Sequence, residues 1–510
     1  MNLEKIVLVE LDPDLPNLGQ LLAMPRFGIT AIGSILNEAG YKTKVLCDVY
    51  EKVSVDNVFS ENPKYIMFNG IRPSMNKVRL MSKTIKRENQ QIPIIIGGEE
   101  ATMSPEKIKD VADYIVLYEG DKTILNLISF LESGKDISRI KGIMYKNSRG
   151  TWITTEKPER IKEINYSLNP AIFKGIKNFG RKNLLARKFN LTQDLRYIRF
   201  PIQTSRGCKF TCSFCSKDSL FGKPGYFERD ISNVITDIDR IMEYSGITRF
   251  SIVDNLFGGS KDYSKRFSKE MISYYEKRDI RPKFSALMRA DQFDNKSLSD
   301  EDISLMDIAG FENICIGMES INQKTLEQYN KKTEISKYKN AIERLLFHNI
   351  NVIGTFAVGG GEDCKKDISA IVKFAKEQNL KQIHLYAFSI TPNTTEYEIN
   401  KHQIISGIDD KYWNGHAVTI FPRKMLPSEL QRGIFNAMRD FYPLTKPIGL
   451  FYRRMLRKIE SSLTDHLSLL EKRETELIDR GIYKKNQNTG DWELNEEIVK
   501  KNPIYYPEKV

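Results

Sequence analysis

The sequence predicts an α/β protein in which a doubly wound parallel sheet is followed by a partial (βα)6 barrel and a mainly helical C-terminal region. Two observations support this: apolar runs alternate with helical patterns along most of the chain, and the period of this alternation lengthens after residue 199. A chain of 510 residues exceeds what one hydrophobic core usually holds, so we expect several domains. The predicted divisions are a first domain at 1–140, a hairpin and linker at 141–198, the barrel at 199–392 and the C-terminal region at 393–510.

The first domain alternates strand and helix signals in a regular order. Short apolar runs indicate buried strands at 5–10, 43–48, 64–69, 93–97 and 113–118. Helical patterns occupy the segments between them at 27–39, 75–88, 104–110 and 121–133. Strands that alternate with helices predict a Rossmann-like parallel sheet, and ligands of such sheets bind beyond the carboxyl ends of the strands.

Three loops follow strands at that edge of the predicted sheet, and each contains glycine, which lets a ligand approach the backbone closely. They are NGIRPS at 69–74, GGEEAT at 97–102 and YEGDKT at 118–123. One such loop alone could be a simple tight turn, but the three together favour a ligand site. The candidate binding residues in these loops are Asn69, Gly70, Gly97, Gly98, Glu119 and Gly120.

A connector and a second alternation follow. A hairpin is expected at 142–161 with its turn near Asn147, and the basic stretch 165–198 is expected to be an irregular linker. Further strands are indicated at 197–205, 249–254, 283–287, 313–319, 351–360 and 383–390. Helical patterns lie between them near 230–245, 262–278, 300–309, 335–348 and 364–378. Such βα units can curve into a partial barrel, whose chemistry should lie at the carboxyl ends of its strands.

Three of the six cysteines lie within eight positions, directly after the first predicted barrel strand: Cys208, Cys212 and Cys215. Cysteine is the usual ligand of iron–sulfur clusters, and three thiolates leave one iron of a four-iron cluster open to another ligand. The alternatives are a zinc site completed by a distant histidine, or three ordinary thiols. No histidine precedes His348, so a nearby histidine cannot complete a zinc site.

This cysteine motif resembles the signature of the radical S-adenosylmethionine (SAM) enzymes. The resemblance includes Arg206 and Gly207 before the first cysteine and Phe214 before the last, which makes Phe214 a candidate cofactor contact. It implies a [4Fe–4S] cluster on the three cysteines, with the amino and carboxylate groups of SAM on the open iron. Reduction then cleaves SAM to a 5′-deoxyadenosyl radical, so the cofactor carries the difficult chemistry.

Later segments resemble other strand motifs of the same family. Glu319 in GMESIN would contact the SAM amino group or ribose, and Arg289 in KFSALMRADQF would lie near the SAM carboxylate. Gly359 and Gly360 would let adenine approach the backbone. The segment VDNLF has Asn255 where relatives often carry a second acid, which is a departure from the pattern. Arg289 could instead be the partner in a surface ion pair.

The first domain is similar to the cobalamin-binding domain that is fused to one large group of radical SAM enzymes. The similarity rests on the segments PRFGITAIGSILNEAGYKTKV, IIIGGEEAT and ADYIVLYEGDKTILNLI. Many cobalamin domains supply a histidine to the cobalt from an Asp-x-His-x-x-Gly motif, which this histidine-free domain lacks. The domain either binds cobalamin without that ligand or has lost the cofactor, and we favour binding.

The fused architecture implies methyl transfer from methylcobalamin to an unactivated carbon of a substrate, in a cavity between the domains that is closed to water. Ring closure or rearrangement, with or without cobalamin, is the alternative. The related methylthiotransferases carry three further cysteines in their N-terminal domain, whereas this domain has only Cys47, so that reaction is disfavoured. Cys315 and Cys364 are expected to be packing or surface thiols.

The C-terminal region shows helical periodicity at 426–442 and 451–480. Trp413 and His416 lie in a loop that either reaches the active site or stays at the surface. The net charge of +12 comes from Lys and Arg mixed with acidic residues along the chain, which favours a solvated surface over a nucleic-acid partner. An RNA-modifying enzyme and a non-catalytic iron–sulfur or zinc module stay as further alternatives.

The partners follow from this interpretation. We expect a small-molecule or peptide substrate, whose identity these residues do not specify, and an external electron donor such as flavodoxin or ferredoxin. No apolar run approaches the roughly 18 residues that span a bilayer, so no membrane partner or signal peptide is expected. Six cysteines in 510 residues do not form a secreted disulfide framework, which favours a reducing cytoplasm.

Overall fold

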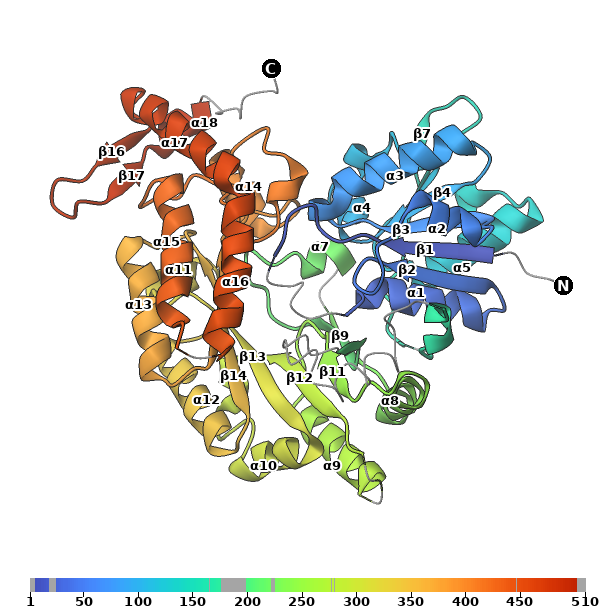
Figure 1. Cartoon of the computed structure of the whole chain (residues 1–510), viewed down its shortest axis with the longest axis horizontal. Helices are drawn as coiled ribbons and strands as arrows, with labels where there is room; N and C mark the ends of the chain where they lie inside the picture. The colour runs from blue at the N-terminus through green and yellow to red at the C-terminus, as the bar shows by residue number, and fades with distance from the viewer. Residues whose placement is uncertain are drawn as a thin grey trace.

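The computed structural model describes residues 5–17, 24–164, 166–175, 199–221, 225–276, 278, 280–445 and 447–501. The N-terminal domain lies beside a sheet of parallel barrel strands, and the C-terminal helices lie against the last of those strands (Figure 1). This arrangement confirms the predicted fold class. Most of the predicted linker, residues 176–198, lies outside the described residues.

The N-terminal sheet has the strand order β2-β1-β3-β4-β5-β6-β7. Its parallel strands are β1 (Lys5–Glu10), β2 (Lys42–Cys47), β3 (Tyr65–Asn69), β4 (Ile94–Gly97) and β5 (Tyr114–Val116). The predicted hairpin forms from β6 (Ile143–Lys146) and β7 (Trp152–Thr154), and it extends the sheet by pairing antiparallel with β5. The hairpin therefore belongs to this sheet and is not a free connector.

Side chains along these strands alternate between two hydrophobic cores, one on each face of the sheet. On β1, Ile6 and Leu8 belong to one core, whereas Val7 and Val9 belong to the other. The helices on the first face are α1 (Phe27–Glu38) and α5 (Gly120–Ser133), and those on the second are α2 (Val55–Ser60), α3 (Met75–Glu88) and α4 (Glu99–Met103). Burial on both faces explains why the strands are continuous apolar runs in the sequence.

One predicted helix of this domain, at 104–110, is wrong. The chain instead forms α4 before it and a short 3-10 helix, η3 (Pro105–Ile108), in its place. Pro105 disfavours the helical conformation for the residue before it, and Ser104 accordingly has φ −144° and ψ 56°. The helix therefore ends at Met103 and a new turn starts at the proline.

The barrel sheet is parallel throughout, with the order β15-β14-β13-β12-β11-β8. Its strands are β8 (Phe200–Ile202), β11 (Arg249–Ile252), β12 (Lys283–Met288), β13 (Phe311–Glu319), β14 (Asn351–Val358) and β15 (Gln382–Ala387). The long connecting helices are α8 (Ile231–Ser245), α9 (Tyr263–Tyr275), α10 (Asp300–Ala309), α12 (Ile335–Phe347) and α13 (Lys365–Glu377). A small hairpin of β9 (Ser205–Cys208) and β10 (Gly225–Glu228), with α7 (Lys217–Phe221) between its strands, follows β8.

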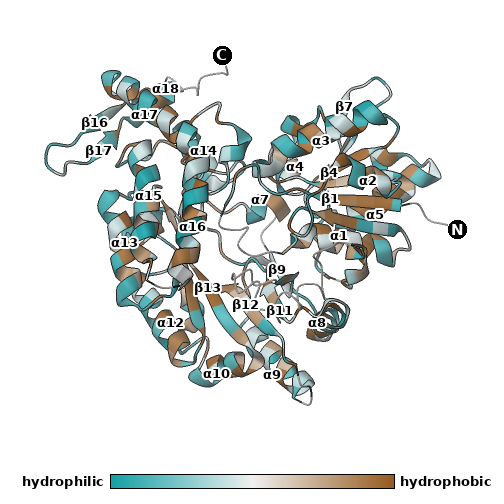
Figure 2. Ribbon diagram, in the orientation of Figure 1, coloured by the Kyte–Doolittle hydropathy of each residue, from teal (hydrophilic) through white to brown (hydrophobic). Residues whose placement is uncertain are grey.

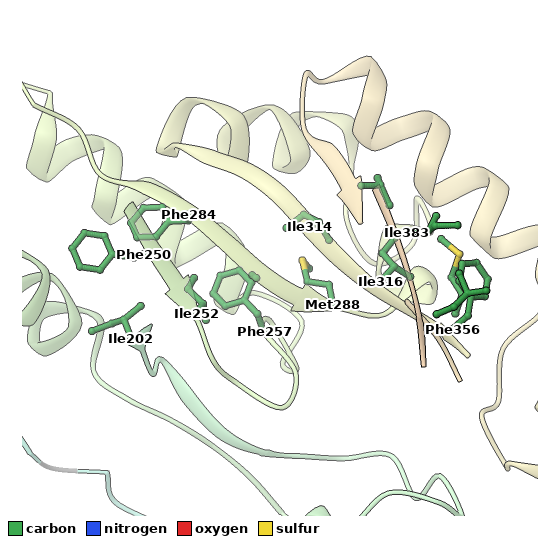
Figure 3. Close-up of a cluster of buried hydrophobic side chains, with 14 of the residues drawn as sticks. Ile202, Phe250, Ile252, Phe257, Phe284, Met288, Ile314, Ile316, Phe356 and Ile383 are labelled. Carbon is green, nitrogen blue, oxygen red and sulfur yellow. The ribbon is translucent and has the colours of Figure 1, made fainter. Parts of the chain in front are cut away.

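Only one face of the barrel strands is filled with apolar side chains. Figure 3 shows this core, in which Phe250, Phe284, Ile314 and other strand residues are buried. Along β12 the alternate positions differ, since Leu287 on the opposite face is 37% exposed. The opposite face of the sheet is therefore not fully covered along β12.

The C-terminal region contains α14 (Thr395–Asn400), α15 (Pro427–Phe441), α16 (Pro447–Ser462), α17 (Thr464–Asp479), α18 (Glu496–Lys501) and a hairpin of β16 (Tyr483–Lys485) and β17 (Trp492–Leu494). The stretch 451–480, with its helical periodicity, forms two helices, because the chain breaks at the buried Leu463 (φ −106°, ψ 7°). Hydroxyls of Ser462 and Thr464 donate to nearby backbone carbonyls there, which competes with helix continuation. The break lets both α16 and α17 pack on α15.

Hydropathy follows this architecture. Brown, apolar positions concentrate on the strands of both sheets, and the C-terminal helices mix apolar and teal, hydrophilic positions (Figure 2). Among the helices that the structure describes, none combines the length and the hydrophobicity needed to cross a lipid bilayer.

Candidate functional site

The three motif cysteines lie at and beyond the end of β9. Cys208 is the last residue of β9 and pairs with Gly225 of β10, so the hairpin closes the base of the cysteine loop. Within the loop, the Cys215 N–H donates to Cys212 O (3.1 Å). All three thiols are free, and none is fully exposed. A tight loop with free, half-buried thiols fits a thiolate-bound cluster.

The three thiols also share one electrostatic environment. Burial raises the pKa of Cys208 and of Cys215, the Cys212 thiol raises both further, and Lys217 lowers both. Among the described residues, no three His, Cys, Asp or Glu side chains surround a single metal-ion position. A four-iron cluster instead distributes its thiolate ligands over separate irons.

Arg289, which the resemblance places near the SAM carboxylate, lies beside this loop. Its Nη1 is 3.9 Å from Cys212 Sγ, and its guanidinium lies 3.7 Å from the ring centroid of Phe210. Nε donates to Asp291 (2.8 Å), and Nη2 donates to Lys331 O (2.6 Å). The side chain is only 8% exposed, which excludes the alternative of a surface ion pair.

Glu319 lies at the carboxyl end of β13, where the pairing register with β14 shifts. Its φ of +62° is unusual for a residue with a side chain, and such backbone strain is frequent at functional sites. The carboxylate accepts a hydrogen bond from Lys331 Nζ (2.6 Å), and the Lys331 side chain is 9% exposed. Sequence reasoning missed Lys331, since a lysine in a loop after a short helix carries no signal of its own.

Phe214 and Gly360 both lie against an aromatic pair, Tyr329 and Phe388. The Phe214 ring lies 5.1 Å from that of Tyr329, which stacks on Phe388 at 5.0 Å. A side chain at Gly360 would collide with these two rings, and one at Gly359 (φ +93°) would collide with Leu430 of α15. The glycines are therefore required by packing here, and their contact with adenine stays a prediction.

A cavity of about 600 Å³ lies at the carboxyl ends of the N-terminal strands. The predicted residues that line it are Asn69, Gly97, Gly98, Glu119 and Gly120. Gly70 does not line it, but its N–H donates to Gly97 O (2.7 Å) and so ties two of the loops together. The cavity also has walls from the barrel side, namely Gln203, Arg206, Phe221, Val253 and Asn255. It is therefore shared by the two domains.

The walls of the cavity differ in character. Its deep part is an apolar slot between the sheet and α1 and α5, lined by Leu8, Met67, Ile95, Val116, Ile29, Ile32 and Ile124. Glu10 also lines the cavity and is 3% exposed, and burial raises the pKa of this carboxyl to about 7 although Arg26 lowers it. A largely apolar cavity with a few polar groups suits a large organic cofactor. Sequence reasoning missed Glu10, although an acidic residue that ends a buried strand is a usable signal.

Two other residues have contacts that the sequence did not predict. Asn255, which departs from the family pattern, accepts a hydrogen bond from the Gly207 N–H (3.2 Å) through Oδ1 and lines the cavity. His416 is 2% exposed and lies 5.4 Å from the Tyr386 ring of β15, so it is not a surface residue. Burial lowers its pKa to about 3.

Comparison with known proteins places both halves of this site in described families. The Radical SAM superfamily matches residues 202–375, and the B12 binding domain matches residues 21–128. An uncharacterized methyltransferase of Pyrococcus horikoshii is 22% identical over 82% of this chain and 87% of its own length. The anaerobic magnesium-protoporphyrin IX monomethyl ester cyclase of Rubrivivax gelatinosus is 24% identical over 70% of this chain and 62% of its own length.

A solved structure gives the same result for the fold. The radical SAM methyltransferase TsrM of Kitasatospora setae, solved with cobalamin and a [4Fe-4S] cluster, has a TM-score of 0.61 at 17% identity over 78% of each chain. The chain is thus a radical SAM enzyme with an N-terminal B12-binding domain. Its cofactors are a [4Fe–4S] cluster, SAM and cobalamin.

Proposed function

We propose that this enzyme is a cobalamin-dependent methyltransferase that methylates an unactivated carbon of a small-molecule or peptide substrate. The observation that carries the proposal is the shared cavity, whose walls come from the loops of the B12-binding domain and from the segment that leads into the cysteine loop. Cofactors in these two places would face a common space, which radical methyl transfer between them needs.

Different residues would hold the different cofactors. Cys208, Cys212 and Cys215 would hold the cluster, and Arg289 and Glu319 would hold SAM beside it. Bound together, the cofactors supply one-electron cleavage of SAM and a transferable methyl group. The apolar walls would exclude water, which protects a substrate radical from side reactions.

The corrinoid would be held without a protein imidazole. Among the described residues that line the cavity, none is a histidine. The loop residues Asn69, Gly97, Gly98 and Gly120 would instead contact the cofactor through their backbone and the Asn69 amide. The inner face of the barrel, with Leu287, would receive the substrate.

Oxidative ring closure is the second candidate, and the similarity to the Rubrivivax gelatinosus cyclase supports it. Both reactions use the same radical generator, so the cysteine site does not separate them. They differ in the second product of SAM, because methyl transfer yields S-adenosylhomocysteine and ring closure does not.

The test is anaerobic purification with hydroxocobalamin, followed by visible spectroscopy and reduction in the presence of SAM. We expect cluster and corrinoid absorption, 5′-deoxyadenosine, and S-adenosylhomocysteine as the mark of methyl transfer. Cys212→Ala is the control and should lose the cluster and 5′-deoxyadenosine while it retains the corrinoid. A cluster without corrinoid bands, or corrinoid without any S-adenosylhomocysteine, would remove the methyltransferase proposal.

The electron donor and the compartment belong to the same proposal. A flavodoxin or ferredoxin is the expected source of the electron, and reduction of the purified cluster by flavodoxin tests this. A reducing cytoplasm is the expected location, since the cluster ligands must stay free thiols until the cluster is bound.

A further inference from the structure

Arg206 connects the two cofactor regions directly. It lies on β9, two residues before Cys208, and its side chain extends from the barrel to the N-terminal domain, where it lines the cavity. β9 lies between the two domains in Figure 1. A residue in this place can transmit the position of one domain to the cysteine loop of the other.

Its guanidinium is engaged on every side. Nη1 donates to Glu119 Oε1 and to Asp121 Oδ2, both at 3.0 Å, and Nη2 donates to Asp121 Oδ1 at 3.1 Å. Nε and Nη2 also donate to Gln203 Oε1, at 3.3 and 3.1 Å. The side chain is 7% exposed. Bidentate contacts of a planar, buried guanidinium fix direction as well as distance, which a lysine cannot reproduce.

The two carboxylates belong to the wall of the cavity. Glu119 and Asp121 flank Gly120, the first residue of α5, and all three line the cavity. Glu119 is held from behind, because its Oε2 accepts the Ile161 N–H (3.0 Å). A ligand bound against this wall would therefore contact Glu119 and Asp121, the ion-pair partners of Arg206.

The backbone between Arg206 and Cys208 is conformationally constrained. Gly207 has φ +94°, and a side chain there would collide with Gly225 O of the paired strand. Its N–H is also fixed by Asn255 (3.2 Å). Because Cys208 follows directly and pairs with Gly225, a displacement of Arg206 displaces the base of the cysteine loop.

We propose that Arg206 is a positioning residue that couples the cavity wall at Glu119 and Asp121 to the cysteine loop. Occupation of the cavity and order of the cysteine loop then stabilise each other, since coupling between two sites is reciprocal. This proposal depends on the proposed function in one respect only, which is the choice of cobalamin as the probe.

Amide hydrogen exchange of the cofactor-free chain tests whether Arg206 couples the cavity wall to the cysteine loop, with Arg206→Lys as the variant. We expect amide exchange to rise about fivefold or more in residues 114–121 and in 205–216 together, while α12 does not change. Arg344→Lys is the matched control, because Arg344 is a buried arginine that pairs with Asp300 far from the cavity. It should leave both segments unchanged.

Hydroxocobalamin is the probe that tests whether occupation of the cavity orders the cysteine loop. In the unaltered chain we expect it to slow exchange in the cysteine loop, and in Arg206→Lys to bind without that protection. If Arg206→Lys fails to fold, Asp121→Asn replaces it, because it removes the bidentate contact and leaves Glu119 in place. Unchanged exchange of the cysteine loop in these variants, or the same rise in Arg344→Lys, would overturn the proposal. Failure of hydroxocobalamin to bind the unaltered chain would count against the proposed function, and the cofactor-free comparison would still decide the role of Arg206.

Discussion

Two ion-pair networks join the N-terminal domain to other parts of the chain, and they are built differently. At the inner one, Arg206 is shared by Glu119 and Asp121 next to the cavity, and Arg160 lies 3.7 Å from the other carboxylate oxygen of Glu119. At the outer one, a single carboxylate, Asp410 of the C-terminal region, is shared by three cations of the N-terminal domain. The inner network joins two cofactor regions, whereas the outer network joins the domain to a loop.

The outer network centres on a buried acid. Asp410 receives Arg72 Nε (3.1 Å), Arg79 Nη2 (3.0 Å) and Lys107 Nζ (2.9 Å). Burial alone would raise the pKa of Asp410, but hydrogen bonds and charges from Lys107 and Arg72 outweigh it and hold the pKa below its ordinary value. Arg72 also lies 3.5 Å from the ring centroid of Trp413.

The difference lies in access to water. At the inner network, Arg206, Glu119 and Asp121 are 7%, 4% and 18% exposed, whereas the outer cations are 18% to 38% exposed. Water can replace a lost partner at the outer network and cannot readily do so at the inner one. The inner network should therefore fix the relative position of the two cofactor regions and contribute more to the free energy of unfolding. The outer network should act as a latch, defined here as an ion-pair contact between the domain and the C-terminal region that salt weakens.

The largest effect is expected from Arg206→Ala. It removes the cation that Glu119 and Asp121 share and leaves Glu119 with Arg160 at 3.7 Å, and breaking a buried ion pair costs about 3 to 5 kcal/mol. Urea unfolding of the cofactor-free chain measures the loss. Arg79→Ala is the matched control from the outer network, where two cations stay on Asp410, and should cost about 1 kcal/mol or less. Equal losses for the two variants would contradict the ranking of the networks.

A second large effect should come from Glu10, a cavity carboxyl without a strong ion pair. Burial raises its pKa from the ordinary 4.5 to about 7 in the folded chain, so the folded state keeps a proton that the unfolded state has lost. Stability should therefore fall as pH rises from 4.5 to about 7, by on the order of 3 kcal/mol.

Unfolding midpoints across this pH range test the prediction in Glu10→Gln. The glutamine oxygen can still accept the Arg26 N–H that Glu10 accepts at 2.8 Å, so the variant removes the titration and keeps the bond. It should flatten the pH profile and be more stable than the unaltered chain above pH 7. Glu88→Gln, at an exposed position of α3, is the control. A profile that Glu10→Gln leaves unchanged would show that Glu10 does not cause the slope.

The fold class could be predicted because apolar residues recur along the sequence with the spacing of buried strands and of helices. Continuous apolar runs such as 5–10 and 94–97 are buried on both faces, and residues 208–215 hold a cysteine spacing with a specific chemical meaning. The misplaced helix at 104–110 shows the limit of periodicity, since Pro105 overrode an acceptable helical pattern. The break at Leu463, where the Ser462 and Thr464 hydroxyls bond to backbone carbonyls, was likewise not revealed by helical periodicity.

The candidate site was predictable only in part. Loop glycines and the cysteines follow from spacing, and most of them reach the cavity or the cysteine loop. Glu119 lines the cavity, but its carboxylate is already bound by Arg206, a partner 87 residues away in the sequence. Pairs such as Lys331 with Glu319 and Arg72 with Asp410 likewise depend on tertiary contact. Residue type alone does not indicate them.

Asp410→Asn should have a moderate effect. The asparagine removes the charge that three cations share but keeps one acceptor oxygen, so the expected loss is about 2 kcal/mol at low salt. Added NaCl at about 0.5 M should shrink this loss, because the cations are partly exposed and screening is stronger there. Asp440→Asn, at an exposed pair with Lys376, is the control and should have little effect. A loss that does not change with salt would place the outer network in the same class as the inner one.

The smallest effect should come from the ring that lies over Arg72. Trp413→Leu removes a cation–π contact worth about 1 kcal/mol, whereas Trp413→Phe keeps an aromatic face and should lose less. Thermal unfolding midpoints of both variants, alone and combined with Asp410→Asn, measure this contribution. The ring and the carboxylate bind the same guanidinium, so their losses should be non-additive. Additive losses would mean that Trp413 contributes only packing and that the latch consists of Asp410 and its cations.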